Sequence, residues 1–316
     1  MNQVIDKPET PAPGRRRWRH SDSAVLRAFA RSRTVQMAST VLVLIVLATL
    51  FAPWLAWQNP FDSGSLELMD AFTPPWTEGT QEAFYALGAD DQGRDVGSAI
   101  LYGLRMSVLV GVSAVLLSLC IGVPLGLVAG YAGGWFDTFL MRIADVQLTF
   151  PVILVAMLIL GIVRGLLPEG ARDEIAVLVI IVAIGLSDWV QYARTVRGAV
   201  MVEKQKDYVL AAQLIGRSRS AILTRHILPN LLASILVIAT ISFAHAIVAE
   251  STLSYLGVGL PPTQPSLGTL IRIGQSFLFS GEWWILLFPS LVLLALALSV
   301  NLVGDWLRDA LNPKLQ

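Results

Sequence analysis

The residue types that most often do chemistry in proteins are few and scattered in this chain. The three histidines are His20, His226 and His245, and the single cysteine is Cys120. There is no H-E-x-x-H metal motif, no cysteine pair and no G-x-x-x-x-G-K-[ST] phosphate loop. We therefore expect no catalytic centre, metal site or cofactor site, and Cys120, inside an apolar run, is expected to fill the core.

A second set of candidates consists of polar residues inside long apolar runs. A charge at the centre of a bilayer costs at least about 2.5–3.5 kcal/mol, so such residues usually face the interior of a helix bundle. His245 and Glu250 lie five residues apart in one run and could either line a path for a solute or pair structurally. Asp145, Asp188 and Asn301 are expected near the inner ends of their runs, in structural hydrogen bonds.

A basic, polar stretch between two apolar runs has the most specific spacing. It reads DYVLAAQLIGRSRSAILTRHILPN at 207–230, with Ala211 and Ala212 followed by Gly216 and then by Leu228 and Pro229. The small alanines offer a face that another protein could approach closely. From the residues alone, both a docking loop and a basic loop that only marks the inner side of a membrane remain open.

The local structure of that stretch is predicted from its caps and breakers. Residues 203–215 have helical composition, and Gly216 can adopt the left-handed conformation that ends a helix. Ser218 or Ser220 can begin a second short helix. Pro229 disfavours the α conformation before it and predicts a break there.

A charged motif, Asp90, Gly93, Arg94 and Asp95, precedes the second apolar run. It either folds as a lid over the outer mouth or forms a structural elbow in which Arg94 pairs with an aspartate. Exposed ion pairs contribute only about 0.2–1 kcal/mol, so stability alone would be a weak reason for such a cluster.

Composition places these candidates in a membrane. The 316 residues are 54% hydrophobic but only 15% charged, whereas soluble domains carry about 25% charged residues. A helix of about 20 apolar residues spans the hydrocarbon core. Six segments qualify or nearly do: 35–57, 106–131, 140–163, 175–194, 231–255 and 284–306. Pro124 and Pro151 are expected to kink the second and third, and Gly122, Gly126 and Gly130 to allow close helix packing.

Charge asymmetry predicts the orientation. With the N-terminus inside, 18 of the 23 Lys and Arg residues fall in inner segments, as positive-inside loops require. We thus expect an all-α integral membrane protein with both termini cytoplasmic. Residues 1–34 are predicted to form a cytoplasmic tail and a juxtamembrane helix, without a cleaved signal. The first span at 35–57 and an acidic periplasmic loop at 58–105 follow. A five-helix core at 106–306 includes a cytoplasmic loop at 195–230, and a tail at 307–316 ends the chain. The outer segment 256–283 is expected to be turn-rich rather than helical.

A family resemblance narrows these alternatives. The loop resembles the EAA loop of permease subunits of bacterial ABC importers. Two further stretches, LGADDQGRDVGSAILYGLRMSV at 87–108 and SYLGVGLPPTQPSLGTL at 254–270 with NLVGDWLRDALNP at 301–313, resemble the C-type permease of dipeptide, oligopeptide and nickel importers. The similarity runs from about 25 to 313. One departure is Leu210, where the family usually has an acid, so that contact is absent or moved to Asp207.

The resemblance implies a six-helix importer permease that takes up short peptides. It implies a second homologous permease, two cytoplasmic ATPase subunits that bind ATP and Mg, and an extracytoplasmic substrate-binding protein; no nucleic acid is expected. The residues of the ATPase-coupling loop would be Asp207, Tyr208, Ala211, Ala212, Gly216, His226, Leu228 and Pro229. His245 and Glu250 could meet a peptide's charged amino end. Nickel chelates, opines or other small solutes remain alternative cargoes; a transporter or channel working without ATP and a membrane enzyme fit less well.

Overall fold

The computed structural model describes residues 29–30, 32–62, 66–80, 83–166, 168 and 175–311. Most of the predicted tail at 1–34, the end of the tail at 307–316 and much of the turn after the third span lie outside these residues. Within the described part, five helices are long and apolar enough to cross a membrane. They are α2 (Arg33–Leu55), α3 (Val96–Ala132), α7 (Ala176–Glu203), a helical run Arg219–Tyr255 that ends in α10 (Leu228–Tyr255), and α12 (Trp283–Leu311).

The predicted third span is a broken pair of helices. α4 (Gly134–Thr149) and α5 (Val152–Leu166) meet at an angle of 94°, and together they would make a sixth span. Pro151 stands at the break; it cannot donate a backbone hydrogen bond and clashes with the preceding turn. The predicted kink is confirmed, and it is sharp enough to separate two helices.

The closest helix pair is α3 with α7, and its glycines explain why. A Cβ on Gly122 would lie 2.4 Å from the carbonyl oxygen of Trp189, and one on Gly126 would lie 2.5 Å from that of Ala193. Gly130 makes a similar approach further along α7. The predicted close packing is confirmed. α3 also begins at Val96, ten residues before the predicted start, so the loop predicted at 58–105 is shorter than expected.

Short elements cover the end of the bundle at which α3 and α12 begin. We name this end the cap end. It contains η2 (Leu68–Asp70), a two-stranded hairpin of β1 (Thr77–Glu78) and β2 (Phe84–Tyr85), and α11 (Leu267–Phe277) with η4 (Leu278–Ser280). The prediction that 256–283 lacks a helix was wrong. Ser266 caps α11 by accepting from the Thr269 backbone N–H, and Leu267 and Leu270 bury its inner face.

The opposite end, which we name the loop end, contains α8 (Asp207–Leu214), α9 (Arg219–Ala221) and the π-helix η3 (Ile222–Ile227). Gly216 has φ +79° and Ser218 caps α9, as predicted. The predicted break at Leu228 was wrong: Leu228 is α-helical, and Pro229 lies in the first turn of α10, where its missing N–H costs nothing.

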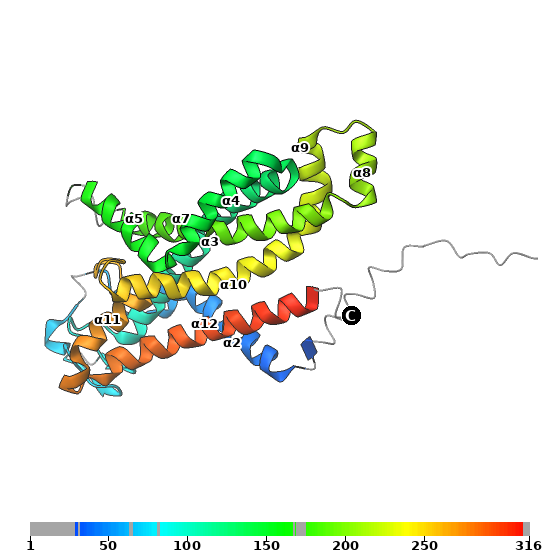
Figure 1. The fold of residues 1–316 in the computed structure, drawn as a ribbon. Helices are drawn as coiled ribbons and strands as arrows, with labels where there is room; N and C mark the ends of the chain where they lie inside the picture. Colours follow the sequence, from blue (N-terminus) through cyan, green and yellow to red (C-terminus); the bar gives the residue numbers. More distant parts are fainter. Residues whose placement is uncertain are drawn as a thin grey trace, which may run out of the picture.

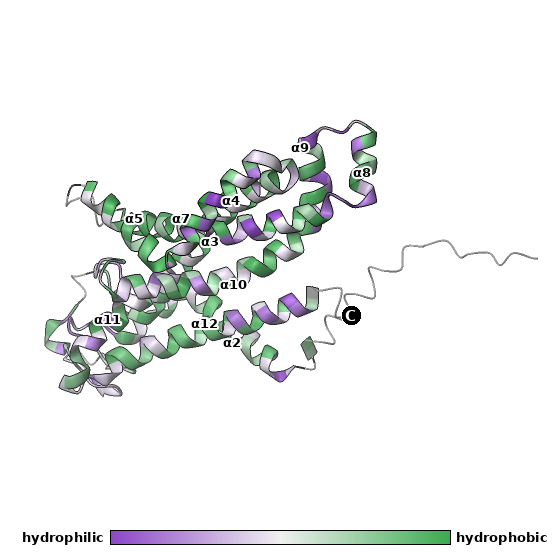
Figure 2. Ribbon diagram, viewed as in Figure 1, coloured by the Kyte–Doolittle hydropathy of each residue, from purple (hydrophilic) through white to green (hydrophobic). Residues whose placement is uncertain are grey.

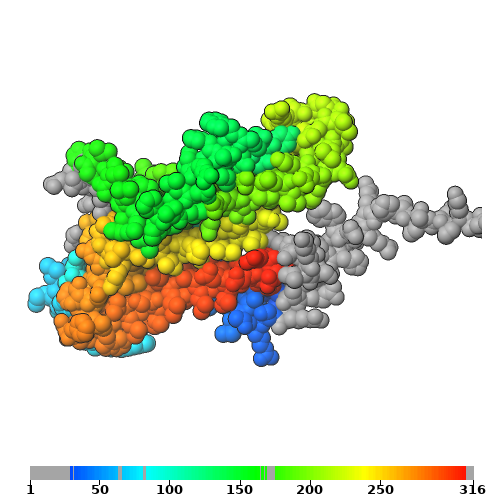
Figure 3. Space-filling view, in the orientation of Figure 1, coloured from blue at the N-terminus to red at the C-terminus, as the bar shows by residue number. Residues whose placement is uncertain are grey.

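The long helices run between these two ends. Figure 1 shows α11 at one end of the bundle, with α8, α9 and the end of α12 towards the other. Figure 2 shows apolar residues along the middle of the helices and hydrophilic residues gathered around α8, α9 and the end of α12. This banding is what a bilayer requires of a spanning bundle. In Figure 3, α8 and α9 project at the loop end.

Candidate functional site

The helical loop is held to the bundle by its own small core. Val209 and Ala212 of α8 are buried with Ile222 and Ile227 of η3, in a cluster that also contains residues of α3, α7 and α10. Ala211, in contrast, is exposed. Only one of the two alanines is therefore free for another protein, while the other fixes α8 to the ends of the spans.

Tyr208 joins the loop to two spans. Its hydroxyl donates to Glu203 at the end of α7 and accepts from the Asn230 side chain at the start of α10 at 3.0 Å. Asn230 also donates to the carbonyl oxygen of His226, 2.8 Å away, within η3. Burial and the hydrogen bond to Glu203 raise the pKa of Tyr208 to about 12, so the hydroxyl keeps its proton.

An apolar tip projects from the loop. Leu214 is 89% exposed and Ile215 is 79% exposed, directly before Gly216, where the chain turns. Nothing lies within 4 Å of a Cβ built on Gly216, so its conformation rather than its surroundings requires glycine. These two residues were not predicted from the sequence, although two large apolar residues before a turn glycine are a usable signal for a docking tip.

A basic cleft lies beside the tip. Its volume is about 680 Å³, and Lys204, Arg217 and Arg219 line it together with Leu210. Leu210 is where the family usually has an acid, and here it is about half exposed at the cleft. Asp207 is exposed in the first turn of α8, where its charge favours the helix dipole.

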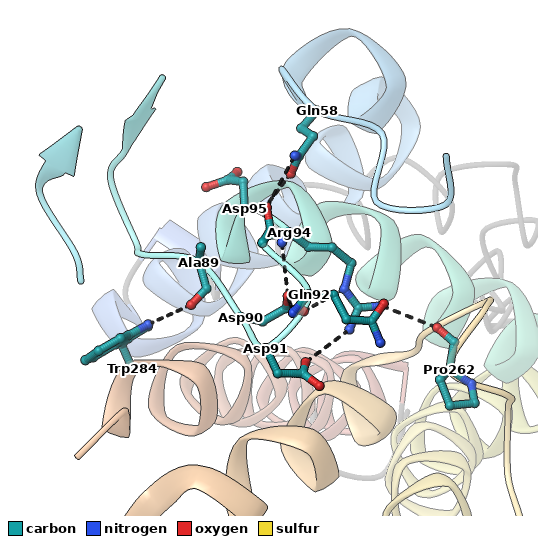
Figure 4. A network of polar contacts seen from close by, with 10 residues as sticks. Gln58, Ala89, Asp90, Asp91, Gln92, Arg94, Asp95, Pro262 and Trp284 are labelled. Carbon is teal, nitrogen blue, oxygen red and sulfur yellow. Dashed lines mark hydrogen bonds and ion pairs between the residues drawn. The ribbon is translucent and has the colours of Figure 1, made fainter. Parts of the chain in front are cut away.

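The charged motif at the cap end is folded inward. Arg94 is 2% exposed, and its Nε donates to Asp90 Oδ2 at 2.6 Å. Asp90 Oδ1 also accepts from the backbone N–H groups of Gln92 and Arg94, and Arg94 Nη1 donates to the carbonyl oxygen of Pro262, 3.4 Å away (Figure 4). Asp91 lies 3.8 Å from Arg94 Nη2; burial, and the neighbouring Asp90, raise the pKa of its carboxyl.

The other members of this motif fix the start of α3. Gly93 has φ +72°, and a Cβ there would meet the carbonyl oxygen of Glu67 at 2.1 Å. Asp95 caps α3 by accepting from Ser98 N–H, and its own N–H donates to Gln58. This arrangement has the geometry of the elbow alternative; a lid role remains a prediction.

The two predicted path residues are not brought together. Glu250 is fully buried and accepts from Ser107 of α3 at 2.8 Å and from Ser254 at 2.7 Å. Those two hydroxyls in turn accept from the backbone N–H groups of Leu267 and Leu260. Glu250 thus ties α3, α10 and the start of α11 together, and its predicted role in a path stays a prediction.

His245 faces a different environment. It is exposed and borders a cavity of about 320 Å³ among α5, α7, α10 and α12. Asp188, Gln191 and Asn301 border the same cavity. Asp188 lies near the middle of α7, because this helix continues to Glu203, beyond the end of the predicted span; its position relative to the inner surface stays a prediction. The described residues include no group of three or more His, Cys, Asp or Glu side chains placed to hold a metal ion.

These features define a class of membrane transport subunit, and a solved structure has the same fold. The chain aligns with a chain of the MetNI methionine ABC transporter in an inward-facing conformation, with a TM-score of 0.52 and 17% identity over 68% of this chain and 96% of that one. A family profile described as the inner membrane component of binding-protein-dependent transport systems matches residues 122–316, and one described as the N-terminal TM domain of oligopeptide transport permease C matches 23–75.

The chain belongs to this family of binding-protein-dependent inner membrane components, as its motifs indicated. Similar relatives include a peptide transport system permease assigned putatively in Brucella suis, 38% identical over 92% of this chain and 91% of its own length. The dipeptide permease DppC of Haemophilus influenzae is 36% identical over 91% and 93%. The oligopeptide permease OppC of Bacillus subtilis is 37% identical over 93% and 89%.

Proposed function

We propose that this chain is one of two permease subunits of an importer that takes up short peptides across the inner membrane. A peptide cargo is supported by the names of the relatives, which are dipeptide, oligopeptide or peptide permeases. These relatives match about nine-tenths of this chain. A second homologous permease completes the pathway, and an extracytoplasmic binding protein delivers the peptide at the cap end. Both termini are cytoplasmic, in agreement with the distribution of Lys and Arg.

Energy enters through the loop end. Two cytoplasmic ATPase subunits bind ATP and Mg, and this chain binds neither. The single observation that carries the docking role is the apolar tip of Leu214 and Ile215, presented on a loop that is anchored by its own core. Such a tip can enter a groove of the ATPase, and the rigid connection to α10 can convert ATPase closure into a tilt of the bundle.

Replacement of both tip residues tests this role. Burying a Leu or Ile side chain contributes about 1.5–3 kcal/mol, so the double variant Leu214→Ser/Ile215→Ser is expected to lose at least about tenfold in ATPase affinity. The second permease should still co-purify, because both tip side chains are exposed and are not part of the buried core of the spans. Phe279→Ser is the matched control, since Phe279 is 98% exposed but lies at the cap end. Equal recovery of the ATPase with all three proteins would exclude the tip as a docking element.

The cargo is tested separately in proteoliposomes that contain the complete transporter and its binding protein. We expect ATP-dependent accumulation of di-, tri- and tetrapeptides, and no accumulation when ATP is replaced by a non-hydrolysable analogue. Retention and uptake of a nickel chelate or an opine instead of peptides would reassign the cargo but leave the architecture intact. Uptake without ATP would contradict the importer itself.

A further inference from the structure

The cavity that His245 borders lies at the middle of α7 and in the cap-end half of α10. Asp188 is twelve residues from the start of α7, and His245 is ten residues from the end of α10, both counted from the cap end. At about 1.5 Å per residue these positions lie about 15–18 Å from the cap-end termini of α7 and α10, which corresponds to half of a hydrocarbon core of about 30 Å. Polar side chains from α7, α10 and α12 converge there.

Asp188 is unusual among the carboxyl groups within the spans because, among the described residues, no side chain donates a hydrogen bond to it. It is only partly buried, and His245, which borders the same cavity, is its electrostatic partner. Glu250, in contrast, is fully buried and held by serine hydroxyl groups. The carboxyl of Glu250 is thus held by hydroxyl groups of the protein, whereas the carboxyl of Asp188 has acceptor positions that a ligand can use.

The polar side chains at this cavity make lipid an unfavourable neighbour, although apolar side chains such as Val152 and Val248 line it as well. His245 and Gln191 are exposed beside Asp188, and polar groups at this depth are strongly disfavoured against hydrocarbon. Figure 3 shows α10 between α5 and α12 on one face of the molecule, and residues of these three helices and of α7 line the cavity. Water, cargo or a polar surface of another subunit must stand there.

We propose that this cavity is a binding subsite in the translocation path and that Asp188 receives the ammonium group of the passing peptide. This inference rests on the proposed function. The carboxylate supplies a charge-assisted acceptor, and the amides of Gln191 and Asn301 offer a donor and an acceptor each to peptide groups. A volume of about 320 Å³ holds a terminal residue rather than a whole peptide. The contact lowers the cost of moving the charged end through the membrane.

The test uses the complete transporter in proteoliposomes, with its binding protein and a mixture of unblocked di-, tri- and tetrapeptides. Asp188→Asn is expected to lower peptide import about tenfold, as the loss of one charge-assisted contact predicts. Stimulation of the ATPase by loaded binding protein should remain. Asp188→Glu should retain most import, and Asp309→Asn, an exposed carboxyl at the loop end, should import normally.

Three results separate the possibilities. If the wild type imports peptides and Asp188→Asn does so equally well, the subsite is excluded while the proposed function stands. If Asp188→Asn no longer co-purifies with the second permease, Asp188 contacts that subunit and the subsite is likewise excluded. If the wild type imports no peptide, the proposed function falls, and this inference with it.

A labelling experiment keeps the proposal testable if the charge variants fold poorly. Cys120 is exposed, so the prediction that it fills the core was wrong, and the labelling therefore uses a Cys120→Ser background, into which Val248→Cys is introduced at the cavity. A water-soluble maleimide should modify this cysteine, and peptide-loaded binding protein with ATP should slow the reaction. Leu44→Cys, 61% exposed on the peripheral α2, should stay unmodified. Equal labelling of both positions, or of neither, would overturn the assignment.

Discussion

At the scale of single residues, the cap end depends on a buried ion pair. Arg94 and Asp90 are both 2% exposed, and Asp90 accepts from backbone as well as from the guanidinium. Removing one partner of such a pair leaves the other charge buried, which typically costs about 3–5 kcal/mol. Gly93 and Pro262 would lose their alignment at the same time, because Arg94 joins the two segments.

Arg94→Ala is therefore expected to lower the free energy of unfolding by about 3–5 kcal/mol, measured by thermal or denaturant unfolding in detergent. The control is Arg194→Ala, whose ion pair with Asp145 is about half exposed and should contribute about 0–1 kcal/mol. The double variant Asp90→Asn/Arg94→Ala should be less destabilised than the two single changes added together. Similar losses in Arg94→Ala and Arg194→Ala would contradict the structural role.

The hairpin at the cap end makes a pH-dependent prediction through Asp70. Burial alone would raise the pKa of this carboxyl, but hydrogen bonds from Thr80 and Tyr85 outweigh burial and lower it below 3.8. A lowered pKa in the folded state adds stability that is present above about pH 4 and is lost as pH falls through the folded value.

Asp70→Asn should thus loosen the hairpin at pH 7, seen as faster proteolysis of the segment around β1 and β2. The difference from the wild type should shrink as the pH is lowered below about 4, because the wild-type carboxyl then becomes neutral as well. Asp62→Asn, in the same outer loop but outside the hairpin, serves as the control. A difference that is constant from pH 7 to pH 3 would exclude the charge of Asp70 as the cause.

At the scale of elements, the α3–α7 contact is set by glycine. Gly126→Ala would place a Cβ 2.5 Å from the carbonyl oxygen of Ala193, so the helices must separate. Overpacking of this kind costs about 1–3 kcal/mol. Gly198→Ala in α7 is the matched control: nothing lies within 4 Å of its added Cβ, and alanine favours the helix by about 0.5–1 kcal/mol. Thermal unfolding should shift in opposite directions, and a stable Gly126→Ala protein would disprove the close contact.

The sequence predicted most of the elements because hydropathy, caps and glycine are local signals. The spans, the turn at Gly216, the cap at Ser218 and the kink at Pro151 all follow from the residues at those positions. Prediction from the sequence failed where tertiary packing determines the local structure. α11 forms because Leu267 and Leu270 find a buried face, in spite of nearby prolines, and Leu228 stays helical because the irregularity is absorbed by the π-helix before it.

The candidate site was predictable in outline but not in its contacts. The spacing of Ala211, Gly216 and Pro229 located the loop, yet no pattern in the sequence says that Ala212 faces inward or that Leu214 projects. The length of α7 beyond Asp188 was not predicted, because apolar runs mark where a span is hydrophobic, whereas α7 continues through polar residues to Glu203. The sequence could not show that Glu250 is held by hydrogen bonds whereas His245 borders a cavity, since the partners of Glu250 come from α3 as well as from its own helix.

At the scale of the whole molecule, one connection joins the loop to the cap end. Tyr208 contacts the end of α7 through Glu203 and the start of α10 through Asn230, and the far half of α10 is tied to α3 by Glu250. α10 is therefore one continuous helix that connects the loop end to the cap end. We expect a displacement of the loop to reach the middle of the bundle through this connection at Tyr208.

Tyr208→Phe removes this connection while leaving the buried side of α8 in place. We expect the ATPase to bind normally and to hydrolyse ATP, but the number of peptides imported per ATP should fall severalfold, because the loop then moves without α10. The ratio is measured by counting imported peptide and released phosphate in the same proteoliposomes. Tyr255→Phe, the same change at the cap end of α10, should leave the ratio unaltered. An unchanged ratio in Tyr208→Phe would mean that motion passes through the hydrophobic cluster around Val209 and Ile227 instead.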